Sequence, residues 1–220
     1  MKPPSPESTP AGAPVDQPGR FSHSRALAAD FYARPVLEVA RELIGCTVTH
    51  GETAGVIVET EAYHEIEPAC HAFAGLTPRT STLFGPPGRA YVYRSYGIHA
   101  LLNAVCEPEG TGAAVLIRAL EPIAGLEAMY LRRHGAKRVE ELCSGPGKLT
   151  QALGISLADN GKDLQHGPVQ IAAASASWRE RAVIEGPRIG ITRAVELPWR
   201  FCAHGSVHVS RPRPWGRVRA

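Results

Sequence analysis

Several features that would point to particular classes of protein are missing from the sequence of 220 residues. No uninterrupted apolar run of about 18 residues occurs, so no membrane-spanning helix is predicted. The five cysteines are an odd number and never lie closer than 24 residues apart. This spacing indicates neither a zinc cage nor a disulfide framework, and it favours a reducing cytoplasm as the location. Lysine is also scarce, with four residues against twenty arginines, and the net charge of +3 is too small to identify a partner.

The length favours one sizeable core rather than two domains. Residues 1–20 are rich in proline, poor in large apolar side chains and without the pattern of a secretory signal. We therefore expect a disordered leader at 1–20 and a single domain at 21–220. A monomer without an obligate protein partner is the expected state.

Residues 56–63, Val-Ile-Val-Glu-Thr-Glu-Ala-Tyr, form an unusual strand. The run opens with β-branched residues suited to a core but ends with two carboxylates and an aromatic ring. Because alternate side chains of a strand share a face, Glu59, Glu61 and Tyr63 are expected to point the same way. Carboxylates are rarely buried without partners, so this face is either wet and structural or the basis of a site.

The remaining pattern predicts short strands, many turns and a few helices. This combination indicates an α+β fold: a single mixed domain with a curved antiparallel sheet, surrounding helices and a protruding β-hairpin. Arg118 is expected at the end of an apolar strand, as is Glu61. The predicted helices are 28–44, 121–133 and 149–153, and the predicted strands are 46–50, 55–63, 90–96, 98–106, 113–118, 169–173 and about 200–202.

Residues 64–88 are rich in proline and glycine and show little periodicity. Such a long irregular segment inside a compact domain suggests a functional loop, in which His71 and Arg79 are the side chains capable of chemistry. Tyr96, beside Gly97 at the expected hairpin tip, is a candidate for insertion into a partner. Residues 144–148 form a turn that enters a helix and suits an anion, with Lys148 adding charge.

Taken together and in order, many segments of this chain resemble the alkyladenine (3-methyladenine) DNA glycosylases, and the likeness runs from about Phe31 to Ser210. The matching segments are Glu59-Thr-Glu61-Ala-Tyr63, His71, Thr77-Pro-Arg79, Phe84-Gly-Pro-Pro-Gly88, Tyr91-Val-Tyr93, Tyr96-Gly97, Asn103, Leu116-Ile-Arg118-Ala-Leu-Glu-Pro122, Leu142-Cys-Ser-Gly-Pro146 with Lys148-Leu149, and Arg188-Ile-Gly190.

The resemblance implies a monofunctional enzyme that flips an alkylated or deaminated purine nucleotide out of duplex DNA and hydrolyses its N-glycosidic bond, as in base excision repair. Glu61 would be the general base for a water molecule, and Arg118 would help hold that water and keep Glu61 ionised. The backbone carbonyl of Ile189 would supply the third contact to the water. Double-stranded DNA is the implied partner, and neither a metal nor an organic cofactor is implied. Glu59 would be structural.

The same resemblance assigns the binding residues. Tyr63 on one side, with His71 and Tyr93 on the other, would sandwich the flipped base, and Asn103 would exclude undamaged guanine by a clash. Tyr96 would fill the space that the flipped nucleotide leaves in the base stack. Arg79 and Lys148 would contact DNA phosphates.

The sequence departs from the family pattern at residues 64–68, at Cys70 and at Thr80. This loop lines the implied base pocket, so the departures leave the lesion preference open. Two other functions also stay open at this point. One is a DNA-damage-binding protein of the same fold that does not cut the bond. The other is metal-assisted hydrolysis by Glu59, Glu61, His64 and His71, although their spacing matches no defined metal motif.

Overall fold

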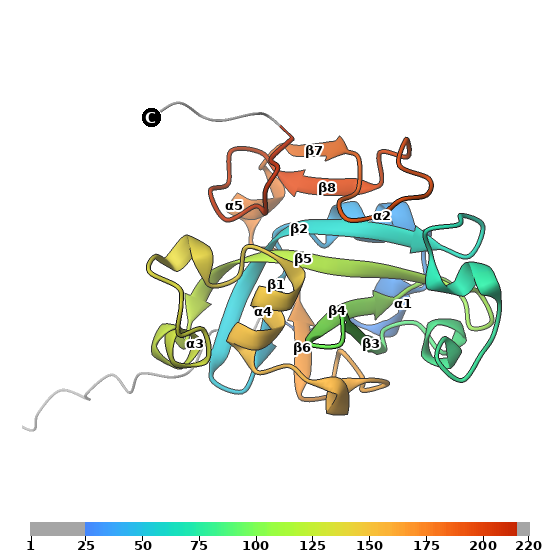
Figure 1. Cartoon of the computed structure of the whole chain (residues 1–220), viewed down its shortest axis with the longest axis horizontal. Helices are drawn as coiled ribbons and strands as arrows, with labels where there is room; N and C mark the ends of the chain where they lie inside the picture. The colour runs from blue at the N-terminus through green and yellow to red at the C-terminus, as the bar shows by residue number, and fades with distance from the viewer. Residues whose placement is uncertain (1–24, 215–220) are drawn as a thin grey trace, which may run out of the picture.

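A computed structural model describes residues 25–214; the predicted leader at 1–20 and the C-terminal Arg217 and Arg219 lie outside this range. The centre of the fold is an eight-stranded sheet in which every pairing is antiparallel, with the order β3-β4-β5-β2-β1-β6 and with β8 joining β2 and β7 (Figure 1). The strands are β1 (Thr47–His50), β2 (Thr53–His64), β3 (Ala90–Ser95), β4 (His99–Val105), β5 (Ala113–Ala124), β6 (Val169–Ala172), β7 (Val183–Gly186) and β8 (Arg200–Ala203). The predicted α+β class is confirmed.

Short helices cover the sheet. Helix α2 packs against β2 and β5, and α4 packs against β4 and β5 from the side nearer the viewer in Figure 1. The α-helices are α1 (Ala29–Tyr32), α2 (Val36–Glu42), α3 (Leu126–Arg132), α4 (Pro146–Leu153) and α5 (Ala176–Arg179), and the 3₁₀-helices are η1 (His71–Ala74), η2 (Ser81–Phe84), η3 (Val139–Glu141) and η4 (Leu157–Asp159). Within residues 25–214, none of the helices has the length and apolarity needed to cross a membrane.

The predicted helix at 28–44 is wrong as one element, since the structure has two helices there. Pro35 occupies the N-cap of α2 with φ −49° and ψ 130°, and the residues before it turn away from helical geometry. A proline disfavours the α region for its preceding residue and has no N–H to donate, so it starts a new helix instead of continuing the old one.

Two twelve-residue strands, β2 and β5, lie side by side at the centre of the sheet. The prediction that Glu61 and Arg118 end their strands is wrong, because β2 continues to His64 and β5 continues to Ala124. The helix expected from residue 121 accordingly begins later, at Leu126. Pro122 is tolerated in β5 because the register with β2 shifts beside it, where a missing N–H costs least.

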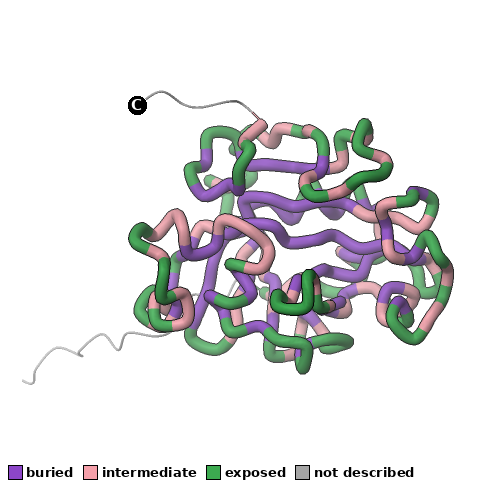
Figure 2. The backbone as a smooth tube through the Cα atoms, viewed as in Figure 1, coloured by how far each residue is buried: buried purple, intermediate pink, exposed green. Residues whose placement is uncertain are grey.

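The pairing of β2 with β5 is also irregular at Glu59, which lies opposite Ala119. The register shifts on both sides of Glu59 cancel, because Ile57 pairs with Leu120 and Thr60 with Ile117. A β-bulge of this kind re-aims nearby side chains. Figure 2 shows these central strands buried along most of their length, with exposed residues concentrated in the surrounding loops. Polar groups on β2 and β5 are therefore placed in the interior, where each needs a partner.

Candidate active site

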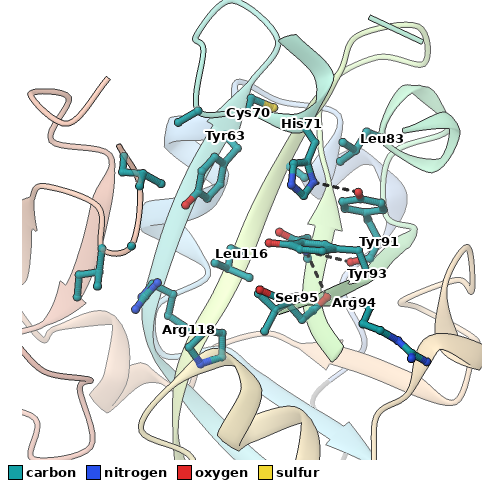
Figure 3. A pocket seen from close by; sticks show the side chains of 18 of the residues that line it. Tyr63, Cys70, His71, Leu83, Tyr91, Tyr93, Arg94, Ser95, Leu116 and Arg118 are labelled. Carbon is teal, nitrogen blue, oxygen red and sulfur yellow. Dashed lines mark hydrogen bonds between the residues drawn. The ribbon is translucent and has the colours of Figure 1, made fainter. Parts of the chain in front are cut away.

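A cavity of about 610 Å³ opens between β2, β3, β4 and the loops after β2 and β7 (Figure 3). Its volume is in the range of small-molecule pockets. It gathers the predicted site residues Tyr63, His71, Arg79, Tyr93, Tyr96, Asn103, Arg118 and Ile189 from segments that are far apart in the sequence. Lys148 lies outside this cavity.

Aromatic rings form two facing walls of the cavity. Tyr63 lies on one side, and His71 and Tyr93 lie on the other with their ring centroids 4.6 Å apart in an edge-to-face contact (Figure 3). Tyr91 supports that second wall, since it stacks on Tyr93 at 5.3 Å and its hydroxyl lies 3.2 Å from Nδ1 of His71. The gap between the walls therefore suits a flat ring.

Irregular residues 64–88 supply part of the second wall. His71 begins η1, and the loop is held by its own polar contacts. Thr80, where the sequence departs from the family pattern, is buried and caps the loop. Its Oγ1 accepts a hydrogen bond from the N–H of Thr77 and donates one to the carbonyl of Gly75. This arrangement is consistent with the expectation that residues 64–88 form a functional loop.

Glu61 has no exposed surface and does not line the cavity, but three residues that do line it contact its carboxylate. Three donors reach its carboxylate: the hydroxyl of Tyr63 at 2.8 Å, Nη1 of Arg118 at 3.2 Å and the backbone N–H of Ile189 at 2.7 Å. Of the face shared by Glu59, Glu61 and Tyr63, the two acids are fully buried and only Tyr63 is partly exposed, so its interpretation as a wet structural surface is wrong.

Burial raises the pKa of the Glu61 carboxyl above its ordinary range, and the nearby charge of Glu59 adds to this. The charge of Arg118 and the hydrogen bonds from Ile189 and Tyr63 oppose the shift. Arg118 was expected to keep the carboxyl ionised by lowering its pKa; it acts in that direction, but desolvation outweighs it. A buried carboxylate with a raised pKa is a stronger base than one in water.

Glu59 is also fully buried, and Arg118 bridges it to Glu61 through Nε at 3.0 Å. Arg200 of β8 and Oγ of Ser210 donate to the same carboxylate oxygen as Arg118, and the backbone N–H of Ser210 donates to the other oxygen. Sequence patterns did not indicate these partners, because residues 141 and 151 positions away leave no periodic signal.

A second buried ion pair stands behind Tyr63. Arg188 binds Glu67 through two hydrogen bonds of 2.6 and 3.0 Å, and its guanidinium lies 4.6 Å from the centre of the Tyr63 ring. Arg188 directly precedes Ile189, so the same side chain fixes a wall of the cavity and the backbone that contacts Glu61. Sequence analysis placed Arg188 in a family motif without giving it a role.

Tyr96 protrudes from the tip of the β3–β4 hairpin, where 88% of its surface is exposed. Its φ of 48° lies in the left-handed region, which is uncommon for a residue other than glycine. Gly97 follows with φ 75° and makes the turn possible. An exposed aromatic ring held in a strained conformation beside the cavity is consistent with the predicted hairpin tip.

The two predicted phosphate contacts lie in different places. Arg79 is exposed at the mouth of the aromatic cavity, where its charge lowers the pKa of His71 after the larger effect of burial. Lys148 lines a neighbouring cavity of about 560 Å³ that shares Arg118 and also contains Arg133, Arg138 and Arg213. Both cavities are thus bordered by positive charge.

In the described part of the chain, no group of three or more His, Cys, Asp and Glu side chains is arranged to hold a metal ion. The acids and imidazoles that cluster in sequence are separated in space. His64 lies 3.2 Å from Glu107, whereas His71 belongs to the aromatic wall.

The cavity thus combines facing aromatic rings, the neighbouring buried carboxylate of Glu61 and surrounding cations. Comparison with known proteins identifies the family. A family model described as methylpurine-DNA glycosylase (MPG) matches residues 30–207. The chain belongs to this methylpurine-DNA glycosylase family.

Individual relatives agree with this. The chain is 52% identical over 213 residues to a protein of Rhodopseudomonas palustris (strain ATCC BAA-98 / CGA009), with 97% of this chain and 96% of the relative covered. It is 52% identical over 202 residues to a protein of Bradyrhizobium diazoefficiens, with 92% of this chain and 99% of the relative covered. It is 48% identical over 190 residues to a protein of Methanoculleus marisnigri, with 84% of this chain and 98% of the relative covered. Each is named "Putative 3-methyladenine DNA glycosylase".

Proposed function

We propose that this protein is a monofunctional DNA glycosylase that flips alkylated or deaminated purines out of duplex DNA and hydrolyses the bond between base and sugar. The observation that carries the proposal is the buried carboxylate of Glu61, held by three donors directly beside an aromatic slot. The family and the names of the relatives support the same chemistry.

In the proposed reaction Glu61 accepts a proton from a water molecule as the water oxygen attacks C1′ of the deoxyribose. The bond between C1′ and the purine nitrogen breaks, its electron pair leaves with the base, and an abasic site remains. The Glu61 carboxylate also stabilises the positive charge that develops on the sugar ring. Arg118 orients this carboxylate, and the backbone carbonyl of Ile189 provides a further contact to the water.

The aromatic walls would hold the flipped base by stacking, with Tyr63 against one face and His71 and Tyr93 against the other. Tyr96 would enter the duplex and fill the space that the nucleotide leaves. Asn103 is fixed by a hydrogen bond from its Nδ2 to the carbonyl of Tyr91, so its position is suited to exclusion of the amino group of guanine.

The charge of the leaving base decides how much help it needs. Purines alkylated at N3 or N7 carry a positive charge and leave without further protonation, whereas neutral lesions need a proton. Burial lowers the pKa of His71, and the charge of Arg79 adds to this, so the protonated form that could donate to the base is disfavoured near pH 7. Packing against the base is the role that suits it.

The experiment is release of free base from duplex DNA that carries hypoxanthine, 3-methyladenine or ethenoadenine, with Glu61→Gln compared with the wild type. The variant keeps the shape of the side chain but cannot take up the proton. We expect release by the wild type, loss of release by the variant, and salt-sensitive DNA binding by both. Equal release by the two proteins would disprove the role of Glu61, and lesion binding without any release would identify a damage-binding protein instead.

A further inference from the structure

We propose that Glu59 is a positioning residue for the reaction: it holds Arg118 in the orientation that contacts Glu61. The inference rests on the proposed glycosylase function. It assigns a mechanistic role to a side chain that does not line the cavity.

The hydrogen bonds of Glu59 leave it no capacity for a substrate. Its Oε1 accepts from Nε of Arg118 at 3.0 Å, Nε of Arg200 at 2.7 Å and Oγ of Ser210 at 2.9 Å. Its Oε2 accepts from the backbone N–H of Ser210 at 2.8 Å. These four hydrogen bonds hold the Glu59 carboxylate in one position in the interior.

Arg118 is the link between Glu59 and Glu61, the group proposed to react. Its Nε binds Glu59, its Nη1 binds Glu61 at 3.2 Å, and its Nη2 lies 3.5 Å from Oγ of Ser210. Because the guanidinium is planar, contacts at Nε and Nη1 together define the orientation of its plane. Without the contact to Glu59, the guanidinium would be held only by Glu61 and by the long 3.5 Å contact to Ser210.

The charges nearest the two acids are balanced, two carboxylates against Arg118 and Arg200. Glu61 is faced by Glu59 and Tyr63 from β2, by Arg118 from β5, by the backbone N–H of Ile189, and also by the more distant Tyr93 and Cys202. Within this set Glu59 is the negative charge that opposes ionisation of Glu61. Removing it should make Glu61 easier to ionise and a weaker base.

The test is single-turnover release of base as a function of pH for the wild type, Glu59→Gln and the matched control Thr60→Val. Thr60 is the next residue of β2, equally buried, and its Oγ1 bonds the carbonyl of Ala40 instead of the arginines. For Glu59→Gln we expect the maximal rate of base release to be at least about tenfold lower, because misplacement of a catalytic group is costly. We also expect the acid limb of the profile, where the rate rises with pH, to be displaced to lower pH. Thr60→Val should lose stability but keep the wild-type profile.

A purely structural role for Glu59 would leave the acid limb in place, and that result would overturn the inference while the glycosylase function stands. Absence of release by the wild type would overturn both. If Glu59→Gln does not fold, Ser210→Ala removes one hydrogen bond to Glu59 and one to Arg118. This variant should release base severalfold more slowly with unchanged DNA affinity, and a wild-type rate would contradict the proposal.

Discussion

The hydroxyl group of Tyr63 donates a 2.8 Å hydrogen bond to Oε2 of Glu61, so one side chain both walls the cavity and holds the group proposed to activate water. The two residues are neighbours on the same face of β2, two positions apart. In the proposed reaction, binding of a base against Tyr63 and ionisation of Glu61 would therefore be coupled.

Tyr63→Phe separates these two roles, since it keeps the ring and removes the hydroxyl. The hydrogen bond from Tyr63 lowers the pKa of Glu61, so its loss raises that pKa further. Glu61 must be ionised to act as a base, and activity therefore rises as pH increases through its pKa. We expect the acid limb of single-turnover base release to move to higher pH, with similar rates on the plateau. A limb that stays in place would show that the hydroxyl does not affect the reacting group.

Tyr96→Ala removes the exposed ring at the hairpin tip. If this ring occupies the vacated space in the duplex, its loss should weaken binding of lesion-containing DNA by a factor of about ten or more, since base–aromatic stacking is worth about 1–3 kcal/mol. Fluorescence of an ethenoadenine in the duplex reports its unstacking directly. Leu131→Ala is the control, because Leu131 is also an exposed apolar side chain but lies on α3. Unaltered unstacking in Tyr96→Ala would argue against a wedge.

Glu67→Gln leaves the buried guanidinium of Arg188 without its counter-charge. Breaking a buried pair in this way typically costs about 3–5 kcal/mol, which urea unfolding should show as a reduced free energy of unfolding. Arg138→Met is the control, since Arg138 pairs with Glu141 at the surface and its loss should change stability little. The double change Glu67→Leu with Arg188→Met should regain part of the stability, and failure to do so would point to other contacts of Arg188.

Lys148→Ala tests the phosphate contact. Each phosphate neutralised by a cation contributes about 0.9 to the slope of log affinity against log salt concentration on duplex DNA. The variant should reduce the magnitude of the slope by about that amount on damaged and undamaged DNA alike. Lys162→Ala is the matched control, an exposed lysine that lines neither cavity. Equal slopes for Lys148→Ala and the wild type would remove Lys148 from the DNA interface.

Local patterns predicted much of the fold. The hairpin at 46–63 was recognisable from β-branched runs around Gly51, and the hairpin with Tyr96 at its tip from Gly97. Element ends were predicted less well. Arg118 suggested the end of a strand because a charge within an apolar run usually marks the surface, whereas here two buried carboxylates accept its hydrogen bonds.

Alternation along β2 by itself determined that Glu59, Glu61 and Tyr63 share a face, because side chains of a strand repeat every second residue. It could not distinguish the two acids from each other. Only the tertiary structure did so: β8 and Ser210 cover Glu59 with donors, while Tyr63 and Ile189 hold Glu61 beside the cavity. The physical reason is that the environment of a buried charge is set by partners brought together from distant parts of the chain, which no local pattern encodes.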